Sequence, residues 1–369
     1  MDQPRKIVVI LGNGFDIDLG LKTSYKDFWE SEYCPKNYPA PLIRHLNSKW
    51  GDNLESVRWY DLENELHEYA LNGDKSDVIN EAERSYILNN NDYLINNQLT
   101  YLGVPDEFNT LVKKGYIQVS DNRLVERACV PYHEDFSFSV LERDNIAFQL
   151  IKERLRNYLY TLGRDEKYTL SISYQVLALL DEEAVKGDYV NLFSFNYTPL
   201  LVMNRTPDAA KVFYVHGSCK EGRIIVGTRD EKLLNEDYDF LQKSFDPTYN
   251  PPALVDDLKD ADDVVFFGHS IGENDRQYFK AFFKQQTEYL HPRRINITIF
   301  TRDDSSETQI RRALQKMTDW NLSTLFGQNN LQIIKTQNLK EDQEKLFNFL
   351  VKHGKDELAT REFIGKHLN

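Results

Sequence analysis

Four short polar motifs carry the side chains that could do chemistry, and each of them follows an apolar run of the chain. They are Gly12-Asn13-Gly14-Phe15-Asp16, Ser194-Phe195-Asn196-Tyr197-Thr198, His216-Gly217-Ser218 and Gly268-His269-Ser270, the last continuing to Asp275. In open α/β sheets, ligands bind in the crevice outside the carboxyl ends of the strands. Together the four motifs therefore indicate a ligand site more strongly than any one of them does alone.

Each motif suits a particular chemistry. The turn Gly12-Asn13-Gly14 would let backbone amides approach a phosphate. Asn196 carries a carboxamide that could grip a ribose hydroxyl or a water. His216 carries an imidazole, the commonest general base. Asp275 lies near the first turn of an expected helix and could bind a ribose diol.

Structural explanations compete with each of these roles. The glycine turn is not a full G-x-G-x-x-G fingerprint, because Ile17 stands where the third glycine would be. Asn196 suits a strand end as a turn former, and Asp275 would favour a helix dipole. Glu63 could reach the site, but its pattern is more typical of the solvated acidic face of an amphipathic helix.

One motif also allows a different class of enzyme. Gly268-His269-Ser270-Ile271-Gly272 matches the G-x-S-x-G nucleophile elbow of α/β-hydrolases, in which a serine follows a strand and precedes a helix. Such an enzyme needs a later acid and a later histidine. His291 and His353 are the candidates, and neither follows a convincing strand.

The elements that must position these motifs alternate between strands and helices. The strand-like runs are Lys6–Leu11, Tyr189–Phe195, Lys211–Val215, Arg223–Val226, Asp263–Phe267, Ile295–Phe300 and Leu331–Ile334. Helical patterns cover Asn145–Leu162, Tyr168–Leu180 and Glu273–Tyr289. Near-continuous apolar strands are typical of a sheet buried on both faces, so we expect an α/β, Rossmann-like, doubly wound and mostly parallel sheet.

The rest of the chain is expected to decorate this single domain of residues 1–369. A largely helical insertion is expected at about 31–142, with helical patterns at Trp59–Ala70 and Ser76–Asn89. The proline-containing stretch Asp237–Pro252 is long enough to cover a site. Two short amphipathic helices are expected at about 340–369.

Composition limits the partners. The formal net charge of −13 argues against nucleic acid as the main partner, since phosphate neutralisation needs clustered Lys and Arg. Cys34, Cys129 and Cys219 are far apart and form no C-x-x-C pair, so neither a disulfide framework nor a metal is expected. No apolar run approaches a membrane span and the N-terminus does not read as a signal peptide, so a cytoplasmic location is expected.

The motifs also resemble a known family. The stretch from Gly12 to Phe28 resembles the N-terminal signature of the AbiH family of bacterial phage abortive-infection proteins. Further motifs of that family appear in the same order, namely Trp59-Tyr60-Asp61-Leu62-Glu63, Phe195-Asn196-Tyr197-Thr198, Val215-His216-Gly217 and the stretch from Gly268 to Asp275.

The same order resembles the wider group of sirtuin-like defence domains, which implies a Rossmann-like fold and NAD or a related nucleotide as ligand. The resemblance assigns NAD hydrolysis to Asn196 and His216. It assigns ligand binding to Gly12, Asn13, Gly14, Phe15, Asp16, Tyr197, Gly268, Ser270 and Asp275. Thr198 departs from this pattern, because an acidic residue is expected there, and Asn13 and Phe15 stand where many sirtuins have small residues. The chain has no four-cysteine zinc ribbon, which disfavours a protein deacetylase of the usual sirtuin kind.

The sequence therefore predicts an antiphage effector that cleaves the nicotinamide–ribose bond of NAD, with the nucleotide as its ligand and no metal. Two alternatives stay open. A nucleotide-binding sensor would keep the crevice without turnover, and Thr198 favours it. A nuclease-type toxin would need a metal cluster that the acidic residues do not suggest. A homo-oligomer would suit a toxin that needs an off state.

Overall fold

A six-stranded parallel sheet forms the centre of the protein. Its strands are β1 (Lys6–Leu11), β4 (Tyr189–Ser194), β5 (Lys211–Tyr214), β8 (Asp263–Phe267), β9 (Asn296–Thr301) and β10 (Asn330–Lys335). They lie in the order β10-β9-β8-β1-β4-β5, and every neighbouring pair is parallel. The residues of β1 from Ile7 to Leu11 are all buried, as expected for a central strand covered on both faces.

This sheet confirms the α/β, Rossmann-like fold expected from the sequence. The computed structural model describes residues 3–50, 61–73, 75, 118–120, 123–125, 139–163, 168–200, 210–230, 236–288, 293–337 and 339–368. Within them the chain divides into two compact units. The first holds the sheet and consists of Met1–Cys34, Trp59–His67 and Lys152–Asn369, and the second consists of Pro35–Arg58 and Glu68–Ile151.

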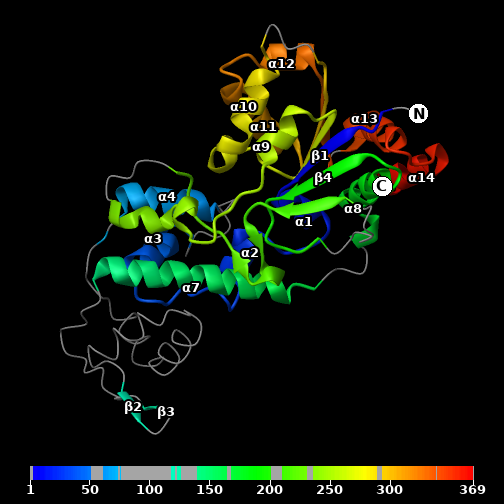
Figure 1. Ribbon diagram of the computed structural model, residues 1–369. Helices are drawn as coiled ribbons and strands as arrows, with labels where there is room; N and C mark the ends of the chain where they lie inside the picture. The colour runs from blue at the N-terminus through cyan, green and yellow to red at the C-terminus, as the bar shows by residue number, and fades with distance from the viewer. Residues whose placement is uncertain are drawn as a thin grey trace. The chain divides into compact units, whose positions relative to one another are not determined.

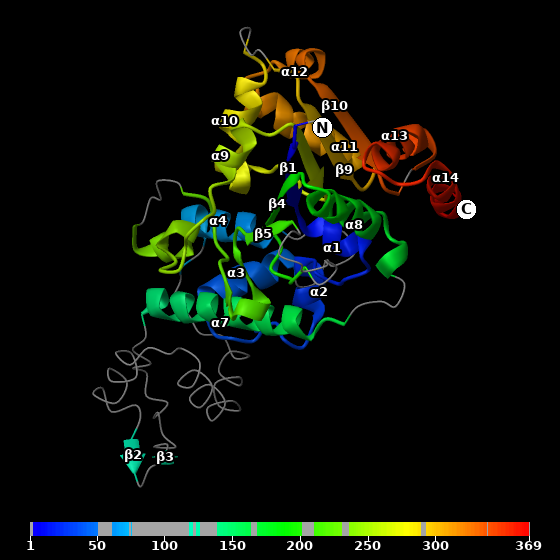
Figure 2. The same ribbon diagram turned by 45° about the vertical axis from the view of Figure 1, so that its right-hand side comes forward.

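Successive residues of β1 point to opposite faces of the sheet, and each face is covered by its own helices. Val8 and Ile10 pack beneath α9 (Leu254–Lys259), α10 (Arg276–Gln285), α11 (Asp304–Met317) and α12 (Leu322–Gln328). Ile7, Val9 and Leu11 pack beneath α1 (Asn13–Asp18), α8 (Ile172–Val185), α13 (Leu339–Lys352) and α14 (Glu357–His367). Figures 1 and 2 show the two helical layers on either side of the strands.

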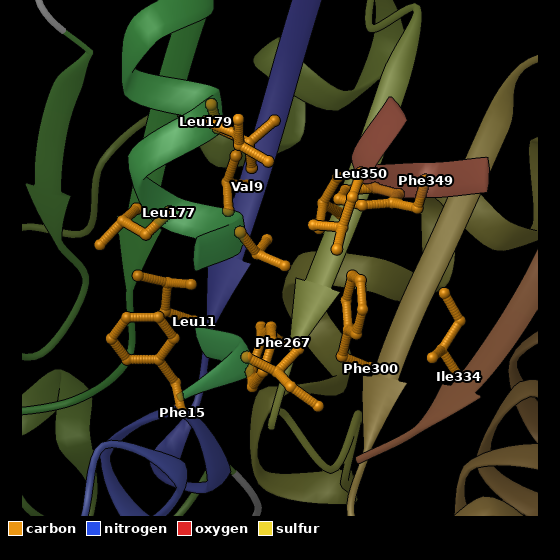
Figure 3. Close-up of a cluster of buried hydrophobic side chains, with 14 of the residues drawn as sticks. Val9, Leu11, Phe15, Leu177, Leu179, Phe267, Phe300, Ile334, Phe349 and Leu350 are labelled. Carbon is orange, nitrogen blue, oxygen red and sulfur yellow. The ribbon is translucent and has the colours of Figure 1, made fainter. Parts of the chain in front are cut away.

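The layer with α8 and α13 is tied to the sheet by interleaved apolar side chains. Figure 3 shows Leu177 and Leu179 of α8 beside Val9, and Phe349 and Leu350 of α13 beside Phe300. The rings of Phe300 and Phe349 meet edge to face at 5.0 Å. Aromatic pairs of this kind add about 0.5–1.5 kcal/mol to the burial of their area, and this pair holds α13 against β9.

Local signals set where several helices begin. Ser24 caps α2 (Tyr25–Glu30) in a capping box with Asp27. Ser171 caps α8 by accepting a hydrogen bond from the backbone of Tyr174. The pattern at Tyr168–Leu180 therefore divides into the short 3-10 helix η1 (Tyr168–Leu170) and α8, which continues five residues past Leu180 to Val185. The long helix α7 (Val140–Thr161) begins before the expected Asn145.

One predicted strand is shorter than expected and has a different partner. The stretch Arg223–Val226 does not join the main sheet. Its first two residues form β7 (Arg223–Ile224), which pairs antiparallel with β6 (Gly217–Ser218) around the 3-10 helix η2 (Cys219–Glu221). Ile224, Ile225 and Val226 are nevertheless buried. An apolar run indicates that a segment is buried, but it does not show which strand the segment pairs with. This explains the difference.

The expected covering loop contains two short 3-10 helices, η3 (Glu236–Leu241) and η4 (Lys243–Phe245). A further one, η5 (Glu273–Asp275), precedes α10, so the pattern expected at Glu273–Tyr289 is a short 3-10 turn followed by a ten-residue helix. None of the helices in the described part of the chain is long and apolar enough to cross a membrane.

The second unit contains α3 (Pro41–Trp50), most of α7, the end of α4 (Leu62–Asn72) and a hairpin of β2 (Gln118–Ser120) and β3 (Arg123–Val125). Its buried polar centre is Asp144, whose carboxylate accepts hydrogen bonds from the backbone of Leu42 and from the Tyr69 hydroxyl. The pattern at Ser76–Asn89 falls outside the described residues, as do Cys129 and His291. The expected division into one domain with an insertion at 31–142 stays a prediction.

Candidate functional site

The connections of the sheet reverse direction between β1 and β8. From β1 the chain proceeds to its neighbour β4 and then to β5. It then returns to β8, on the other side of β1, and proceeds outward to β9 and β10. Doubly wound sheets bind ligands at such a switch point, outside the carboxyl ends of the strands. The turns that leave β1 and β8 are therefore the place to examine for a site.

These two turns pack directly against each other. The amide of Gly12 donates to the carbonyl of Phe267 at 3.0 Å, and the amide of Gly14 donates to the carbonyl of Gly268 at 2.9 Å. A Cβ atom on Gly14 would lie 2.7 Å from the Gly268 Cα atom. The glycines therefore permit close approach of two backbones. Because both amides are already used, a phosphate would need other donors than these two, which revises the role expected for them.

Three side chains of the first turn are also held within the protein. Asn13 accepts a hydrogen bond from the Thr23 hydroxyl at 2.5 Å, and Asp16 accepts one from the Thr198 hydroxyl. Phe15 is buried in the core with its ring edge-on to Phe267 at 5.6 Å. Thr198, where an acidic residue was expected, thus serves as a hydrogen-bond donor to a buried carboxylate.

The motif after β4 fixes the same turn from the other side. The Asn196 amide group donates to the carbonyl of Gly12 at 3.0 Å. The Tyr197 hydroxyl donates to the carbonyl of Ile225 at 3.2 Å. Asn196 therefore holds the backbone that follows β1, and its side-chain oxygen and second N–H could still orient a ribose or a water.

Five ionisable side chains meet beside these turns, and we name them the carboxyl-edge cluster. They are Glu63 from α4, His216 after β5, Lys243 from η4, His269 after β8 and Asp275 from η5. The Lys243 ammonium lies 3.0 Å from Glu63, 3.3 Å from the Nε2 atom of His216 and 3.5 Å from Asp275. Asp275 lies 3.2 Å from His216 and 3.4 Å from His269. All five residues belong to the first unit.

Glu63 and Lys243 correct the sequence interpretation. Glu63 is buried and paired with Lys243, and does not lie on a solvated face. Lys243 had no expected role, and its side chain is only 2% exposed. The only sequence signal for it was its position in the stretch expected to cover a site. A buried ammonium is uncommon unless it is paired, so its place between two carboxylates explains why it is tolerated.

The turn after β8 orients His269. The backbone amide of Ile271 donates to the Nδ1 atom of His269 at 2.9 Å, so we assign the ring proton to Nε2, which faces Asp275. Gly268 and Ile271 both have positive φ angles, 64° and 52°. A β-branched residue is strained in this region, and such strain clusters at functional sites. The strained turn places the His269 ring against the Asp275 carboxylate.

His216 is held by the same carboxylate. The Nε2 atom of His216 faces both the Asp275 carboxylate and the Lys243 ammonium, and its buried Nδ1 atom has no hydrogen-bond partner. The ring of Phe195 lies edge-on to both histidines, with centroids 5.3 Å from His216 and 4.5 Å from His269. The Phe195 ring thus covers one side of both histidines.

The cluster drives the pKa values of its carboxyl groups apart. Burial raises the pKa of Glu63 to about 7, although Lys243 partly opposes the rise. Burial would also raise the pKa of Asp275, but Lys243, His216 and His269 together hold it well below its ordinary value. Two neighbouring carboxyl groups with separated pKa values are typical of acid and base assignments in enzymes.

The two bases respond in opposite directions. Burial and the neighbouring Lys243 ammonium lower the pKa of His216 to about 4, so the ring is neutral at pH 7. Burial would lower the pKa of Lys243, but Glu63 and Asp275 raise it above its ordinary value. The cluster at neutral pH therefore contains an ammonium, an ionised Asp275, a neutral His216 and a Glu63 near its titration midpoint.

Ser270 does not form the nucleophile of a triad in the described part of the chain. Its side chain is exposed, and no hydrogen bond joins it to a described histidine. His353 lies instead against Glu183, which also binds Arg5 before the start of β1. That position is at the amino end of the sheet, opposite to Ser270.

An open groove begins beside the cluster and follows α10. Its volume is about 760 Å³. It is lined by Arg229, Asp230, Glu273, Asn274, Arg276, Gln277, Lys280, Ala281 and Lys284. Glu273, Asn274 and Arg276 are the sequence neighbours of Asp275, whereas the cluster residues themselves do not line the groove. Over the described ranges, no group of three or more His, Cys, Asp and Glu side chains is placed to hold a metal ion.

The fold and the site define the class as an α/β protein with a Rossmann-like sheet and a buried ionic cluster at its carboxyl edge. The family model described as "Bacteriophage abortive infection AbiH" matches residues 8–299. The chain therefore belongs to the AbiH family, which links it to phage defence by abortive infection. No curated protein and no solved structure matches the chain.

Proposed function

We propose that this AbiH protein acts in abortive infection by binding NAD or a related nucleotide and hydrolysing its nicotinamide–ribose bond. The observation that carries the proposal is the carboxyl-edge cluster, in which the pKa values of Glu63 and Asp275 are driven apart beside a neutral His216. Titratable groups perturbed in this way, at the switch point of an α/β sheet, are typical of an enzyme site.

The chemistry of the bond suits this set of groups. Loss of neutral nicotinamide from a pyridinium requires no acid, and it leaves positive charge on the ribose carbon and ring oxygen. An ionised carboxylate fixed in a dry site stabilises such a charge without reorganisation. Asp275 is the carboxylate held in the ionised form, by Lys243 and the two histidines.

His216 and Asn196 would position the reacting ribose. The unpartnered Nδ1 atom of the neutral His216 suits it to form a hydrogen bond with a ribose hydroxyl, which can donate or accept. The Asn196 side-chain oxygen, whose amide partner is fixed on Gly12, could orient the hydroxyl or the attacking water. Glu63, with a pKa near 7, is suited to remove the proton from that water at neutral pH.

The test is nicotinamide release from NAD by the purified full chain. The wild-type protein should release nicotinamide, and His216→Ala and Asn196→Ala should reduce the rate by about 100-fold or more. His367→Ala is the control, because His367 lies on α14 and contacts the carbonyl of Phe363, away from the cluster. Equal rates in all four proteins would contradict the assigned roles, and no release by the wild type would contradict the activity.

A nucleotide sensor without turnover is the second candidate. The observation in its favour is that the amides of Gly12 and Gly14 and the amide group of Asn196 are all bonded within the protein, as in a rigid recognition site. The same experiment separates the two functions. Saturable binding of NAD with no nicotinamide release would identify the sensor.

A further inference from the structure

The cations of the groove lie on one face of α10. Arg276, Lys280 and Lys284 are spaced four residues apart, which places them in a line along the helix. All three lower the pKa of Asp319, led by Lys284, whose ammonium lies 3.0 Å from that carboxylate. Their charges therefore act toward the same side of the helix, along the groove.

The groove is basic although the chain is acidic. Its lining contains four basic residues, Arg229, Arg276, Lys280 and Lys284, against the two acids Asp230 and Glu273. The whole chain carries a formal net charge of −13. Arg276 is paired with Glu273 at 3.3 Å and Lys284 with Asp319 at 3.0 Å, and the remaining excess of positive charge favours ligands of the opposite sign. The groove is thus suited to an anionic group.

An exposed tryptophan stands at the far end of this line. Helix α11 ends in a Schellman motif, in which the amide of Trp320 donates to the carbonyl of Gln315 at 2.8 Å. The apolar residue after such a motif commonly packs back on its helix, but the Trp320 side chain is 73% exposed. Its φ angle is +71°, a conformation that bulky residues rarely adopt.

Trp320 follows Asp319, which contacts Lys284 at the end of α10. The helix from Arg276 to Lys284 rises by about 12 Å, at 1.5 Å per residue. The three cations therefore follow α10 from the residue after Asp275 to Lys284, and the exposed Trp320 is the residue after the carboxylate that Lys284 contacts. Aromatic rings of this kind stack nucleobases.

We propose that the groove along α10 binds the phosphates and the adenosine of the nucleotide, with the phosphates against Arg276 and Lys280 and the base on Trp320. This inference rests on the proposed function, because it takes the nicotinamide ribose to lie at Asp275. The groove volume of about 760 Å³ is within the range of small-molecule sites and suits a dinucleotide better than a nucleic-acid strand.

The test uses ADP as the probe, because ADP carries the phosphates and the adenosine without nicotinamide. Calorimetric titration should show ADP binding to the wild type and binding about tenfold weaker to Lys280→Glu, since a cation is replaced by an anion. Lys211→Glu is the matched control, because Lys211 is an exposed lysine on the edge strand β5. It should bind ADP like the wild type.

The tryptophan is tested by two further variants. Trp320→Ala should weaken ADP binding about fivefold or more, and Trp320→Tyr, which keeps an aromatic ring, should retain most of the affinity. For NAD hydrolysis, Lys280→Glu and Trp320→Ala should raise KM with kcat unchanged. Because both side chains are exposed, neither replacement should prevent folding.

The outcomes distinguish this inference from the proposed function. ADP binding that is lost in Lys280→Glu supports the groove even if NAD is not hydrolysed. If NAD is hydrolysed with the same KM by all variants, the inference about the groove is wrong and the proposed enzyme activity stands. Failure of the wild type to bind ADP also overturns it. Tighter binding of a short single-stranded oligonucleotide than of ADP would assign the groove to nucleic acid.

Discussion

Two buried ionic groups of side chains lie at opposite ends of the same sheet, and they are built differently. The carboxyl-edge cluster consists of Glu63, His216, Lys243, His269 and Asp275. The second group lies at the amino ends of the strands, and we name it the amino-edge network. Its members are Arg5, Glu183, Asp188, Asp263, Lys352 and His353.

The amino-edge network satisfies its charges at short distances. Arg5 lies 2.6 Å from both Glu183 and Asp188, and His353 lies 2.6 Å from Glu183. Burial would raise the pKa of Glu183, but His353 and Arg5 lower it below its ordinary value. This network connects α8 and α13 to the start of β1.

The carboxyl-edge cluster has longer contacts, from 3.0 to 3.5 Å, and one ammonium shared by two carboxylates and a histidine. Each region leaves one histidine nitrogen without a partner, Nδ1 of His216 and Nε2 of His353, so an unpaired nitrogen does not distinguish them. The difference lies in the shifted pKa values: burial raises the pKa of Glu63, and burial together with the Lys243 ammonium lowers the pKa of His216. A network that only supports the fold pairs its charges closely. A catalytic site depends on groups whose pKa values are shifted in this way.

Removing the charge of Asp275 should give the largest effect. Asp275→Asn keeps the size of the side chain but removes the anion that would stabilise the ribosyl cation. We expect the rate of nicotinamide release to fall by about 1,000-fold, or about 4 kcal/mol in the barrier. The measurement is kcat for NAD hydrolysis by folded protein. A kcat within about threefold of the wild type would place the chemistry elsewhere.

The opposite result is expected at the amino edge. Glu183→Gln leaves the buried His353 and one side of Arg5 without a carboxylate. Breaking a buried pair in this way typically costs about 3 kcal/mol of the free energy of unfolding. Denaturant titration measures this loss, and kcat per folded molecule should stay at the wild-type value. A large fall in kcat without loss of stability would show that the two regions had been assigned the wrong way round.

Glu63 should make the stability of the protein depend on pH. Its folded pKa of about 7 is above the ordinary value of 4.5. Its stabilising contribution is therefore present below pH 4.5 and is lost as the pH rises through 7. The free energy of unfolding of the wild type relative to Glu63→Gln should fall by at most about 3 kcal/mol over that range.

This pH dependence is measured by thermal or denaturant unfolding at several pH values. His216 contributes a slope of the opposite sign, because its pKa is lowered from 6.5 to about 4 and its contribution is lost as the pH falls through 4. That slope is present in both proteins and cancels in the difference. Glu30→Gln, at an exposed carboxylate of α2, is the control. If the free energies of unfolding of wild type and Glu63→Gln differ by the same amount at every pH, the raised pKa of Glu63 is contradicted.

The sequence predicts the sheet well where burial and strand pairing coincide. Asp263–Phe267 and Lys6–Leu11 are fully apolar or nearly so, and both are central parallel strands. Arg223–Val226 has the same apolar character but pairs antiparallel in a separate two-stranded unit. The periodicity of side chains reports how deeply a segment is buried, and the partner of a strand depends on the whole topology.

The sequence predicts the strand-end members of the cluster for a similar reason. His216, His269 and Asp275 each follow a strand within a few residues, so a local pattern places them at the carboxyl edge. Glu63 and Lys243 come from a distant helix and a 3-10 turn. Only the fold shows that they face each other at 3.0 Å. For the glycine turn, the local pattern suits phosphate binding, and only the fold shows that it also packs against the backbone of Gly268.

The smallest expected effect concerns Trp320. It tests whether the strained backbone of this residue is kept because its ring binds a ligand. Its φ angle of +71° costs a non-glycine residue about 1–2 kcal/mol, and its exposed ring recovers little of this by packing. Asparagine adopts this conformation more readily, so Trp320→Asn should raise the free energy of unfolding by about 0.5–1 kcal/mol while weakening ADP binding.

Leu358→Asn is the control, since it also removes an exposed apolar side chain but from the helix α14, and it should bring no gain. Denaturant unfolding and calorimetric titration of the same preparations measure both quantities. A loss of stability in Trp320→Asn would mean that the tryptophan supports the fold like the amino-edge network, and would remove the reason to regard it as a binding residue.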